Sequence, residues 1–111
     1  MSNSVSNPAL TSESLIDTAS DSELSLFTAS LVKGDETAWV TFYESSRLRL
    51  LGYLSRTWHG EPSHLDDLLQ ETLLRAVRYM RVFHDEAALW SWLTVLARSA
   101  VADHGRRRSR W

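Results

Sequence analysis

Residues 64–83, HLDDLLQETLLRAVRYMRVF, carry apolar side chains over almost the whole circumference of the helix that their spacing predicts. One face is wide enough to be the core side of a helical bundle. That face consists of Leu65, Leu68, Leu69, Thr72, Ala76, Met80 and Phe83. A second face mixes charged and aliphatic side chains and consists of Asp67, Glu71, Leu74, Arg78 and Arg81, with Asp66, Gln70, Leu73 and Val77 between the two faces.

Two explanations for this second face remain open. A small bundle can bury such a helix on most of its sides. Alternatively, the second face binds a protein partner that brings arginines and apolar groups of its own. Protein interfaces typically place apolar contacts within charged surroundings. The mixture of side chains on this face would suit such an interface.

The segments before this stretch predict two further helices. Residues 21–34 combine an N-cap candidate at Asp21, acids in the first turn and a stop at Gly34, so they predict a short helix. Asp35 is placed to cap a longer helix that reaches about Arg56. Its buried stripe is predicted to contain Trp39, Phe42, Tyr43, Ser46, Leu50, Tyr53 and Leu54.

Breaks in the pattern define the third and fourth helices. A glycine and a proline in residues 57–64 end the second helix, and Ser63 with Asp66 resembles a capping box that opens the third. Asp85 is a cap candidate for a fourth helix, and Gly105 is a candidate for its end. The core positions of this fourth helix are predicted to be Leu89, Trp92, Leu93, Leu96, Ala100 and Val101.

No segment alternates between apolar and polar residues as a strand would, so the predicted fold is all-α. We expect a small helical bundle of three long helices plus a short N-terminal helix. The length of 111 residues supports one compact domain, which we assign to residues 21–111. Residues 1–20 are rich in serine, and their apolar residues define no face, which predicts a disordered N-terminal arm.

The composition argues against several classes of protein. Without cysteine the chain has no disulfide framework, thiolate zinc site or cysteine nucleophile. The four histidines include no pair at the i, i+4 spacing of a helical metal site, so we expect neither a metal nor a cofactor. No motif for nucleophilic or acid–base catalysis is apparent, and we expect a protein that is not an enzyme. No apolar run reaches the roughly 18 residues of a membrane span, and a secretory signal is missing, so we expect a cytoplasmic protein without membrane contact.

The net charge of −2 hides an uneven distribution. Five of the eleven arginines lie between Arg98 and Arg110, where Asp103 is the only acid. Clustered guanidinium groups fit phosphate oxygens and release counterions when they bind nucleic acid. The basic end therefore favours a phosphate-bearing partner, and a solvated basic tail is the alternative interpretation.

Three motifs in a fixed order carry a family resemblance. Residues 64–78, HLDDLLQETLLRAVR, resemble the D-A-E-D-L-V-Q-E-T-F-L-R-A-W-R motif of region two in bacterial sigma factors, especially the extracytoplasmic-function group. Upstream, LVKGDETAWVTFYE at residues 31–44 is similar to the family's G-D-E-x-A-F-x-x-L-Y motif. Downstream, residues 83–108 read F-x(5)-L-x-x-W-L-x-x-L-A-R-S-x-x-x-D-H-x-R-R-R and resemble the family's closing pattern F-x-x-W-L-x-x-I-A-R-N-x-x-x-D-x-x-R-R, with Leu89 in place of the usual aromatic residue. The resemblance covers about residues 22–110.

This resemblance implies a transcription initiation module that binds core RNA polymerase. In the family, the helix that matches residues 64–83 docks on the clamp coiled coil of the polymerase large subunit. The matching positions in this chain are Asp66, Asp67, Gln70, Glu71 and Leu74. Such a contact would explain why the predicted helix has a second face that is both acidic and aliphatic.

The resemblance also implies recognition of the minus-ten promoter element and opening of the DNA strands. Residues 79–88 and 92–108 match the loop and the helix with which the family captures a flipped base of the non-template strand. The expected DNA-binding residues are Trp90, Arg98, Ser99, Asp103, Arg106, Arg107, Arg108 and Arg110.

The expected DNA-binding residues differ in their roles. Trp90 takes a position that is usually polar, so we expect it to point outward and stack on a base or contact a protein, whereas Trp92 is expected in the core. Arg98 is expected either to reach a phosphate or to form an ion pair on the helix surface. The terminal arginines are expected to contact phosphates and position the domain without reading sequence. Ser99 stands where the family usually has asparagine, so base capture is expected to be weaker or altered.

Alternative functions follow from the departures from the family. No helix-turn-helix region that reads the minus-thirty-five element follows Trp111, so we expect either a piece of a longer sigma factor or a stand-alone region-two domain. A rival interpretation is a sigma-like interaction protein without promoter-reading activity, such as a decoy for an anti-sigma factor or a regulator of polymerase. A third is a helical DNA-binding domain unrelated to polymerase. An anti-sigma factor is also a possible partner under the first interpretation.

Overall fold

The computed structural model describes residues 20–109, with side chains as far as Arg107. The chain forms α2 (Asp21–Val32), α3 (Glu36–Thr57), the 3-10 helix η3 (Pro62–His64), α4 (Leu65–Tyr79) and α5 (Glu86–Ser109). Residues 20–109 contain no strand, which confirms the all-α prediction of three long helices and a short first one. The predicted disordered arm lies outside the described residues, apart from Ser20.

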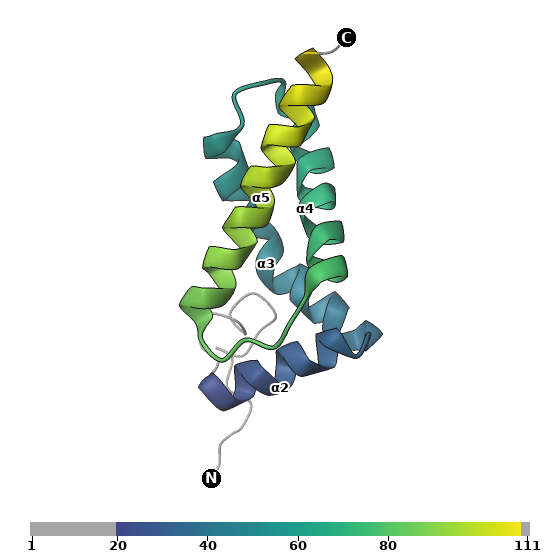
Figure 1. The fold of residues 1–111 in the computed structure, drawn as a ribbon, viewed down its shortest axis with the longest axis vertical. Coiled ribbons are helices and arrows are strands. Elements are labelled where there is room, and N and C mark those ends of the chain that lie inside the picture. Colours follow the sequence, from purple (N-terminus) through teal and green to yellow (C-terminus); the bar gives the residue numbers. More distant parts are fainter. Residues whose placement is uncertain (1–19, 110–111) are drawn as a thin grey trace.

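The three longer helices lie side by side along the long axis of the molecule, and α2 crosses one end (Figure 1). Helix α4 packs against both α3 and α5, while α3 also packs against α5 and α2. The segment that joins α4 to α5 passes beside α2 (Figure 1). None of the helices within residues 20–109 is long and apolar enough to cross a bilayer.

The ends of α2 depend on Ser20 and Gly34. The N-cap is Ser20 and not the predicted Asp21, because Ser20 and Glu23 form a reciprocal capping box. Hydrogen bonds from the backbone and side chain of Ser20 hold the pKa of Glu23 below its ordinary value. After Val32 the chain turns at Gly34, whose φ of 84° lies in the left-handed region that favours glycine. The predicted stop at Gly34 is confirmed.

The predicted boundaries of the later helices are right in part. Asp35 caps α3 by accepting a hydrogen bond from the Ala38 amide at 3.2 Å, as predicted. The capping box predicted at Ser63 is wrong, because the 3-10 turn η3 leads into α4 and no side chain caps that helix. The helix predicted to reach Phe83 ends at Tyr79, since a tertiary contact of Phe83 draws the chain away from the helix axis.

Helix α5 continues beyond its predicted end at Gly105 and reaches Ser109. A glycine ends a helix when it adopts positive φ, and within the described residues only Gly34 does so. Asp85 accepts a hydrogen bond from the Ala87 amide at 3.2 Å, which agrees with its predicted position just before α5. The longer helix carries the first arginines of the basic end in helical geometry.

The core lies where α3, α4 and α5 meet. The core face predicted for residues 64–83 is largely confirmed: Leu68, Leu69, Thr72 and Ala76 of α4 are buried, as is Phe83 beyond its end, and Leu65 and Met80 pack against them partly buried. Burial at 3.6-residue spacing is what a helix with one core face requires. Trp39 packs edge-on against Phe42 and donates its indole N–H to the Leu31 carbonyl at 3.0 Å, which joins α3 to α2.

Candidate functional site

The second face of α4 is open to solvent. Asp66, Asp67 and Gln70 are exposed, and Leu74 and Val77 are 58% and 56% exposed. The alternative in which a small bundle buries this helix on most sides is therefore wrong. A helix face that keeps aliphatic side chains in water beside carboxylates has the composition of a protein-binding surface.

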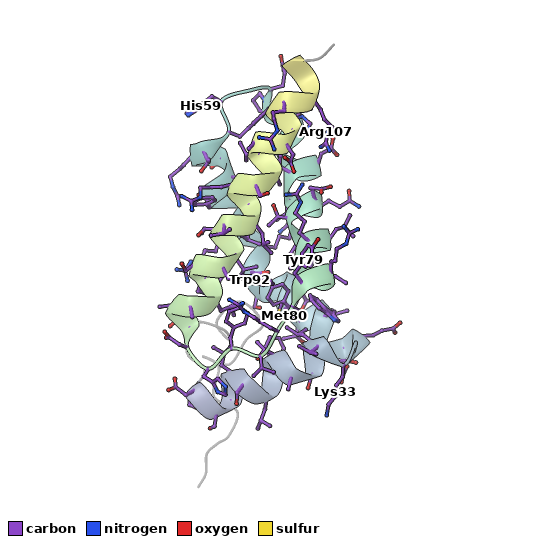
Figure 2. All side chains as sticks on the ribbon, viewed as in Figure 1. Lys33, His59, Tyr79, Met80, Trp92 and Arg107 are labelled. Atoms are coloured by element: carbon purple, nitrogen blue, oxygen red, sulfur yellow. The ribbon has the colours of Figure 1, made fainter. Side chains whose placement is uncertain are left out.

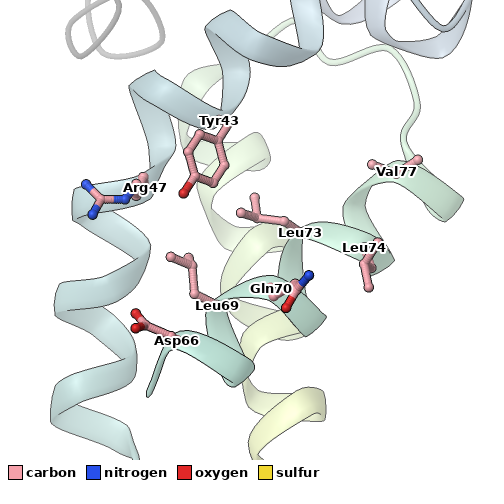
Figure 3. Close-up of a pocket in the computed structure, with 8 residues that line it drawn as sticks. All are labelled: Tyr43, Arg47, Asp66, Leu69, Gln70, Leu73, Leu74 and Val77. Carbon is pink, nitrogen blue, oxygen red and sulfur yellow. The ribbon is translucent and has the colours of Figure 1, made fainter. Parts of the chain in front are cut away.

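This face continues across a groove onto α3. The groove has a volume of about 520 Å³ and is lined by Tyr43, Arg47, Asp66, Leu69, Gln70, Leu73, Leu74 and Val77. Figure 3 shows the ring of Tyr43 extending from α3 toward the leucines of α4, with Arg47 on the same helix. Apolar walls therefore stand beside an arginine, a carboxylate and an amide that can orient a partner. We call this set of eight residues the α3–α4 groove.

Tyr43 corrects the predicted buried stripe of α3, because its side chain is 44% exposed. Helix α4 covers only one side of α3, and Tyr43 lies at the margin of that contact and lines the groove instead of the core. Sequence reasoning did not include Tyr43 or Arg47 among the site residues. Their one-turn spacing on α3 was the available signal, but the partner helix could not be assigned from it.

Arg75 joins the outer side of α4 to α5 through all three nitrogens of its guanidinium group. Nε donates to Glu71 at 3.0 Å, Nη1 donates to the Ser99 hydroxyl at 2.8 Å, and Nη2 donates to Asp103 at 2.7 Å. The other carboxylate oxygen of Asp103 accepts from Arg106, one helical turn further along α5. Four charges of alternating sign thus run from the face of α4 to the basic end of α5. We call Glu71, Arg75, Asp103 and Arg106 the charge ladder.

The charge ladder shifts the protonation equilibria of its central pair. The hydrogen bond that Arg75 donates to Asp103 is the main reason that the pKa of Arg75 is raised above its ordinary value. The same hydrogen bond is the main reason that the pKa of Asp103 is lowered. Both shifts favour the charged forms of Arg75 and Asp103. Arg75 was not predicted as a site residue, although its i, i+4 spacing from Glu71 was visible in the sequence.

The predicted DNA-binding residues of α5 are brought together in part. Arg98 and Ser99 are exposed on neighbouring positions, and Arg107 lines a hollow with Asp67, Glu71 and His104. Asp103 and Arg106 are engaged with each other as described above. Figure 2 shows Arg107 near the end of α5 that lies away from α2. The side chain of Arg108 and the whole of Arg110 lie outside the described residues.

Trp90 does not point outward, so the expectation for this residue is wrong. Its side chain is only 6% exposed and packs in the core between α5 and α3. The guanidinium carbon of Arg49 lies 4.0 Å from the ring centroid, which covers the outer side of the indole. Helix α5 packs on two helices, so its buried face is wider than the predicted stripe and includes Trp90 beside Leu93 and Ala97.

The loop between α4 and α5 is held against α2. The Phe83 amide donates to the hydroxyl of the buried Thr28 at 2.9 Å, and the Phe83 ring lies 5.1 Å from that of the partly buried Trp92. Around this anchor Tyr79 and Val82 are exposed. The loop thus has a fixed centre, with one exposed aliphatic side chain within it and an exposed aromatic side chain at the end of α4.

The histidines gather partly at the end of the bundle away from α2. The rings of His64 and His104 have centroids 4.8 Å apart, and Trp58 lies edge-on to both. No group of three or more histidine, cysteine, aspartate or glutamate side chains suited to hold a metal ion occurs within residues 20–107. This cluster packs aromatic rings against one another at the junction of η3 with α5.

The structure is a small all-α bundle in which an acidic and aliphatic face of α4 lies beside the arginine-bearing helix α5. Residues 42–110 match the family described as Sigma-70 region 2. Because this match covers more than half of the chain, the chain belongs to the Sigma-70 region 2 family. The family resemblance seen in the three motifs is thereby confirmed.

Named relatives agree with this assignment. The chain is 37% identical over 91 residues to the probable RNA polymerase sigma-C factor of Mycobacterium bovis, which covers 78% of this chain and 46% of that protein. It is 38% identical over 76 residues to the extracytoplasmic-function RNA polymerase sigma factor SigF of Caulobacter vibrioides, which covers 68% of this chain and 42% of that protein. The chain thus spans less than half the length of these relatives. No solved structure matches it at a significant level.

Proposed function

We propose that this chain acts in transcription initiation as a sigma factor region 2 domain. It binds core RNA polymerase through the outer face of α4 and contributes to recognition and opening of the minus-ten promoter element through the α4–α5 loop and α5. The observation that carries the proposal is the exposed acidic and aliphatic face of α4 in a chain of this family. The domain works by binding energy alone and needs no cofactor.

The polymerase contact involves Asp66, Asp67, Gln70, Glu71 and Leu74, and its partner is the clamp coiled coil of the large subunit. The exposed carboxylates suit a partner surface that bears arginines, and Leu74 supplies apolar area near the centre of the face. The α3–α4 groove adds further apolar wall beside these residues. Burial of the exposed Leu74 side chain on binding contributes favourable binding free energy, and the carboxylates orient the partner.

The DNA contact involves exposed Arg98, the partly engaged Ser99 and Asp103, and the arginines at residues 106–110. Arginines along one helix neutralise phosphates of a single strand, which positions the domain without reading bases. The anchored loop at residues 80–85 supplies the remaining surface for the non-template strand. Trp90 is not part of this proposal, because it is buried.

The polymerase contact is tested by titrating a fragment that contains the clamp coiled coil with matched leucine variants. Leu74 and Leu48 are 58% and 55% exposed, but Leu48 lies on α3 and does not line the α3–α4 groove. Leu74→Ala is expected to weaken binding by about fivefold or more, as loss of a central interface residue does, while Leu48→Ala leaves affinity unchanged. Equal affinities of both variants and the parent chain would reject the α4 face as the contact.

The DNA contact is tested by fluorescence anisotropy on an A/T-rich single-stranded oligonucleotide over a range of salt concentrations. Binding is expected to weaken with salt, with a slope of about 0.7 per phosphate neutralised. Arg98→Ala is expected to reduce that slope by about 0.7, whereas Arg47→Ala on α3 leaves it unchanged. Clamp binding without any DNA binding at low salt would favour the sigma-like interaction protein over the promoter-reading domain.

A further inference from the structure

A small pocket lies between α3 and α5, and we call it the α3–α5 pocket. It has a volume of about 140 Å³ and is lined by Arg49, Leu50, Tyr53, Arg56, Trp90 and Thr94. None of these six residues lines the α3–α4 groove. They bring two guanidinium groups, two hydroxyls and an indole N–H, whereas none of the described lining residues carries a carboxylate. Hydrogen-bond donors and positive charge in one small space suit an anion.

One donor of the pocket lining lacks an acceptor. Trp90 is only 6% exposed, and its indole Nε1 forms no hydrogen bond within the described part of the chain. Two other indoles are satisfied, since Trp39 donates to the Leu31 carbonyl at 3.0 Å and Trp58 donates to the Glu61 carbonyl at 2.8 Å. Native proteins seldom leave a buried polar group unpaired, and a bound ion or ligand is one reason for an exception. An anionic oxygen in the α3–α5 pocket supplies the acceptor that the Trp90 N–H lacks.

The two arginines of the pocket differ in their surroundings. Arg49 pairs with Glu86 at 4.0 Å and lies over the Trp90 ring, so its charge is partly balanced. Arg56 is exposed and forms no ion pair with another described residue. Its Nη1 lies 3.6 Å from the position that a Cβ on Gly52 would take, so the glycine one turn earlier leaves room for the guanidinium group along α3. Arg56 therefore supplies the positive charge that an anion in the pocket can use.

We propose that the α3–α5 pocket binds the phosphate group of a small molecule, with Arg56 as its cation and Trp90 as its buried donor. The planar guanidinium fork can donate to two phosphate oxygens at once. The pocket is smaller than the roughly 300–1,000 Å³ of pockets for drug-sized ligands, so it takes the phosphate group alone. The ligand is inorganic phosphate or a phosphomonoester whose remainder stays outside. This inference goes beyond the proposed function, because no residue of the pocket takes part in the proposed polymerase or DNA contact.

Indole resonances report directly on the buried donor. Inorganic phosphate is titrated into the 15N-labelled chain at constant pH and ionic strength, and the assigned indole Nε1–H resonances are followed by NMR. The Trp90 resonance is expected to move downfield and to saturate, because its N–H gains an acceptor. The resonances of Trp39 and Trp58 are expected to stay in place, because both N–H groups already donate to carbonyls. A Trp90 resonance that stays still, or that moves no further than the other two, would overturn the proposal.

Matched arginine variants test the cation. Arg56 and Arg47 are both exposed on α3, but Arg47 lines the α3–α4 groove instead. Arg56→Gln is expected to weaken phosphate binding by about tenfold or more, as loss of a charge-assisted hydrogen bond does. Arg47→Gln removes the same charge from the chain and is expected to change the affinity by less than about twofold, since a distant exposed charge is screened. Equal effects of the two substitutions would mean a general charge effect and would contradict the site.

The source of the phosphate group is decided by titrating further probes against the Trp90 resonance. Ribose 5-phosphate that binds more tightly than inorganic phosphate would support a phosphomonoester, and the reverse order would support inorganic phosphate. Acetate that binds more tightly than both would overturn the assignment of phosphate in favour of a carboxylate. A single-stranded oligonucleotide, whose phosphates are diesters, is expected to leave the Trp90 resonance unmoved. Movement with the oligonucleotide and not with either small phosphate would overturn the proposal.

Discussion

The backbone amide of Phe83 donates a hydrogen bond of 2.9 Å to the hydroxyl of Thr28, across 55 positions of sequence. The same hydroxyl donates to the Leu24 carbonyl at 2.9 Å. A single buried hydroxyl group therefore forms hydrogen bonds both to the α4–α5 loop and to the preceding turn of α2. This contact sets the course of the segment between α4 and α5. Helix α2 therefore supports the loop that is part of the proposed DNA contact.

Thr28→Val is predicted to destabilise the fold by about 1–3 kcal/mol, because it leaves the buried Phe83 amide without its acceptor. The matched control is Thr72→Val, at another fully buried threonine whose hydroxyl donates to the Leu68 carbonyl within its own helix. Urea unfolding measures both, and hydrogen exchange reports the Phe83 amide. Equal costs for the two variants, with Phe83 still protected, would contradict the anchoring role of Thr28.

Substitution of alanine for each of two glycines is predicted to change the stability of the fold in opposite directions. At Gly34 nothing lies within 4 Å of an added Cβ, so Gly34→Ala meets only the penalty of positive φ and destabilises by about 1–2 kcal/mol. Gly105 lies within α5 and is equally free of neighbours, so Gly105→Ala stabilises the helix by about 0.5–1 kcal/mol. Thermal unfolding of both variants checks this, and a destabilising Gly105→Ala would show that α5 does not extend past that residue.

The charge ladder predicts a defined sensitivity to acid. The hydrogen bond from Arg75 lowers the folded-state pKa of Asp103 below its ordinary value of 3.8. A depressed carboxyl pKa stabilises the fold fully above the unfolded pKa, and the contribution is lost as the pH falls from about 3.8 through the lower folded value. Asp103→Asn should therefore destabilise at pH 7 and differ less from the parent chain near pH 2. A difference that is the same at both pH values would mean that Asp103 acts through its shape alone.

Trp90 is predicted to matter for stability and not for DNA binding. Trp90→Leu removes much of a buried ring and is expected to lower the free energy of unfolding by about 2–3 kcal/mol. The control Val95→Ala, at a residue 49% exposed on the same helix, is expected to change that free energy by no more than about 0.5 kcal/mol. Affinity for single-stranded DNA, measured where the variant is fully folded, should be unchanged. A loss of DNA affinity under those conditions would require a surface role that the burial of Trp90 argues against.

Much of the fold followed from spacing and caps. Asp35 predicted the start of α3 because an N-cap interaction spans only three residues. The core face of α4 followed from its 3.6-residue period, whereas the spacing left open whether the second face is buried or exposed. The three motifs, in order along the chain, indicated the family that the match to Sigma-70 region 2 confirmed.

The contacts between elements decided the rest. A period shows that a face is apolar but not which neighbour covers it, so Trp90 and Tyr43 were assigned to the wrong environments. Likewise, the end of α4 at Tyr79 depends on Thr28, which is remote in sequence, and the spacing of residues 64–83 contains no sign of it.

The amino-acid sequence by itself determined the helices, the buried side of α4 and the family, since these depend on neighbours within a few residues or on motifs read in order. Only the tertiary structure decided that Arg75 reaches Ser99 and Asp103, 24 and 28 positions away. Three hydrogen bonds from one guanidinium group require acceptors on two packed helices, and the register between those helices is set by the whole core.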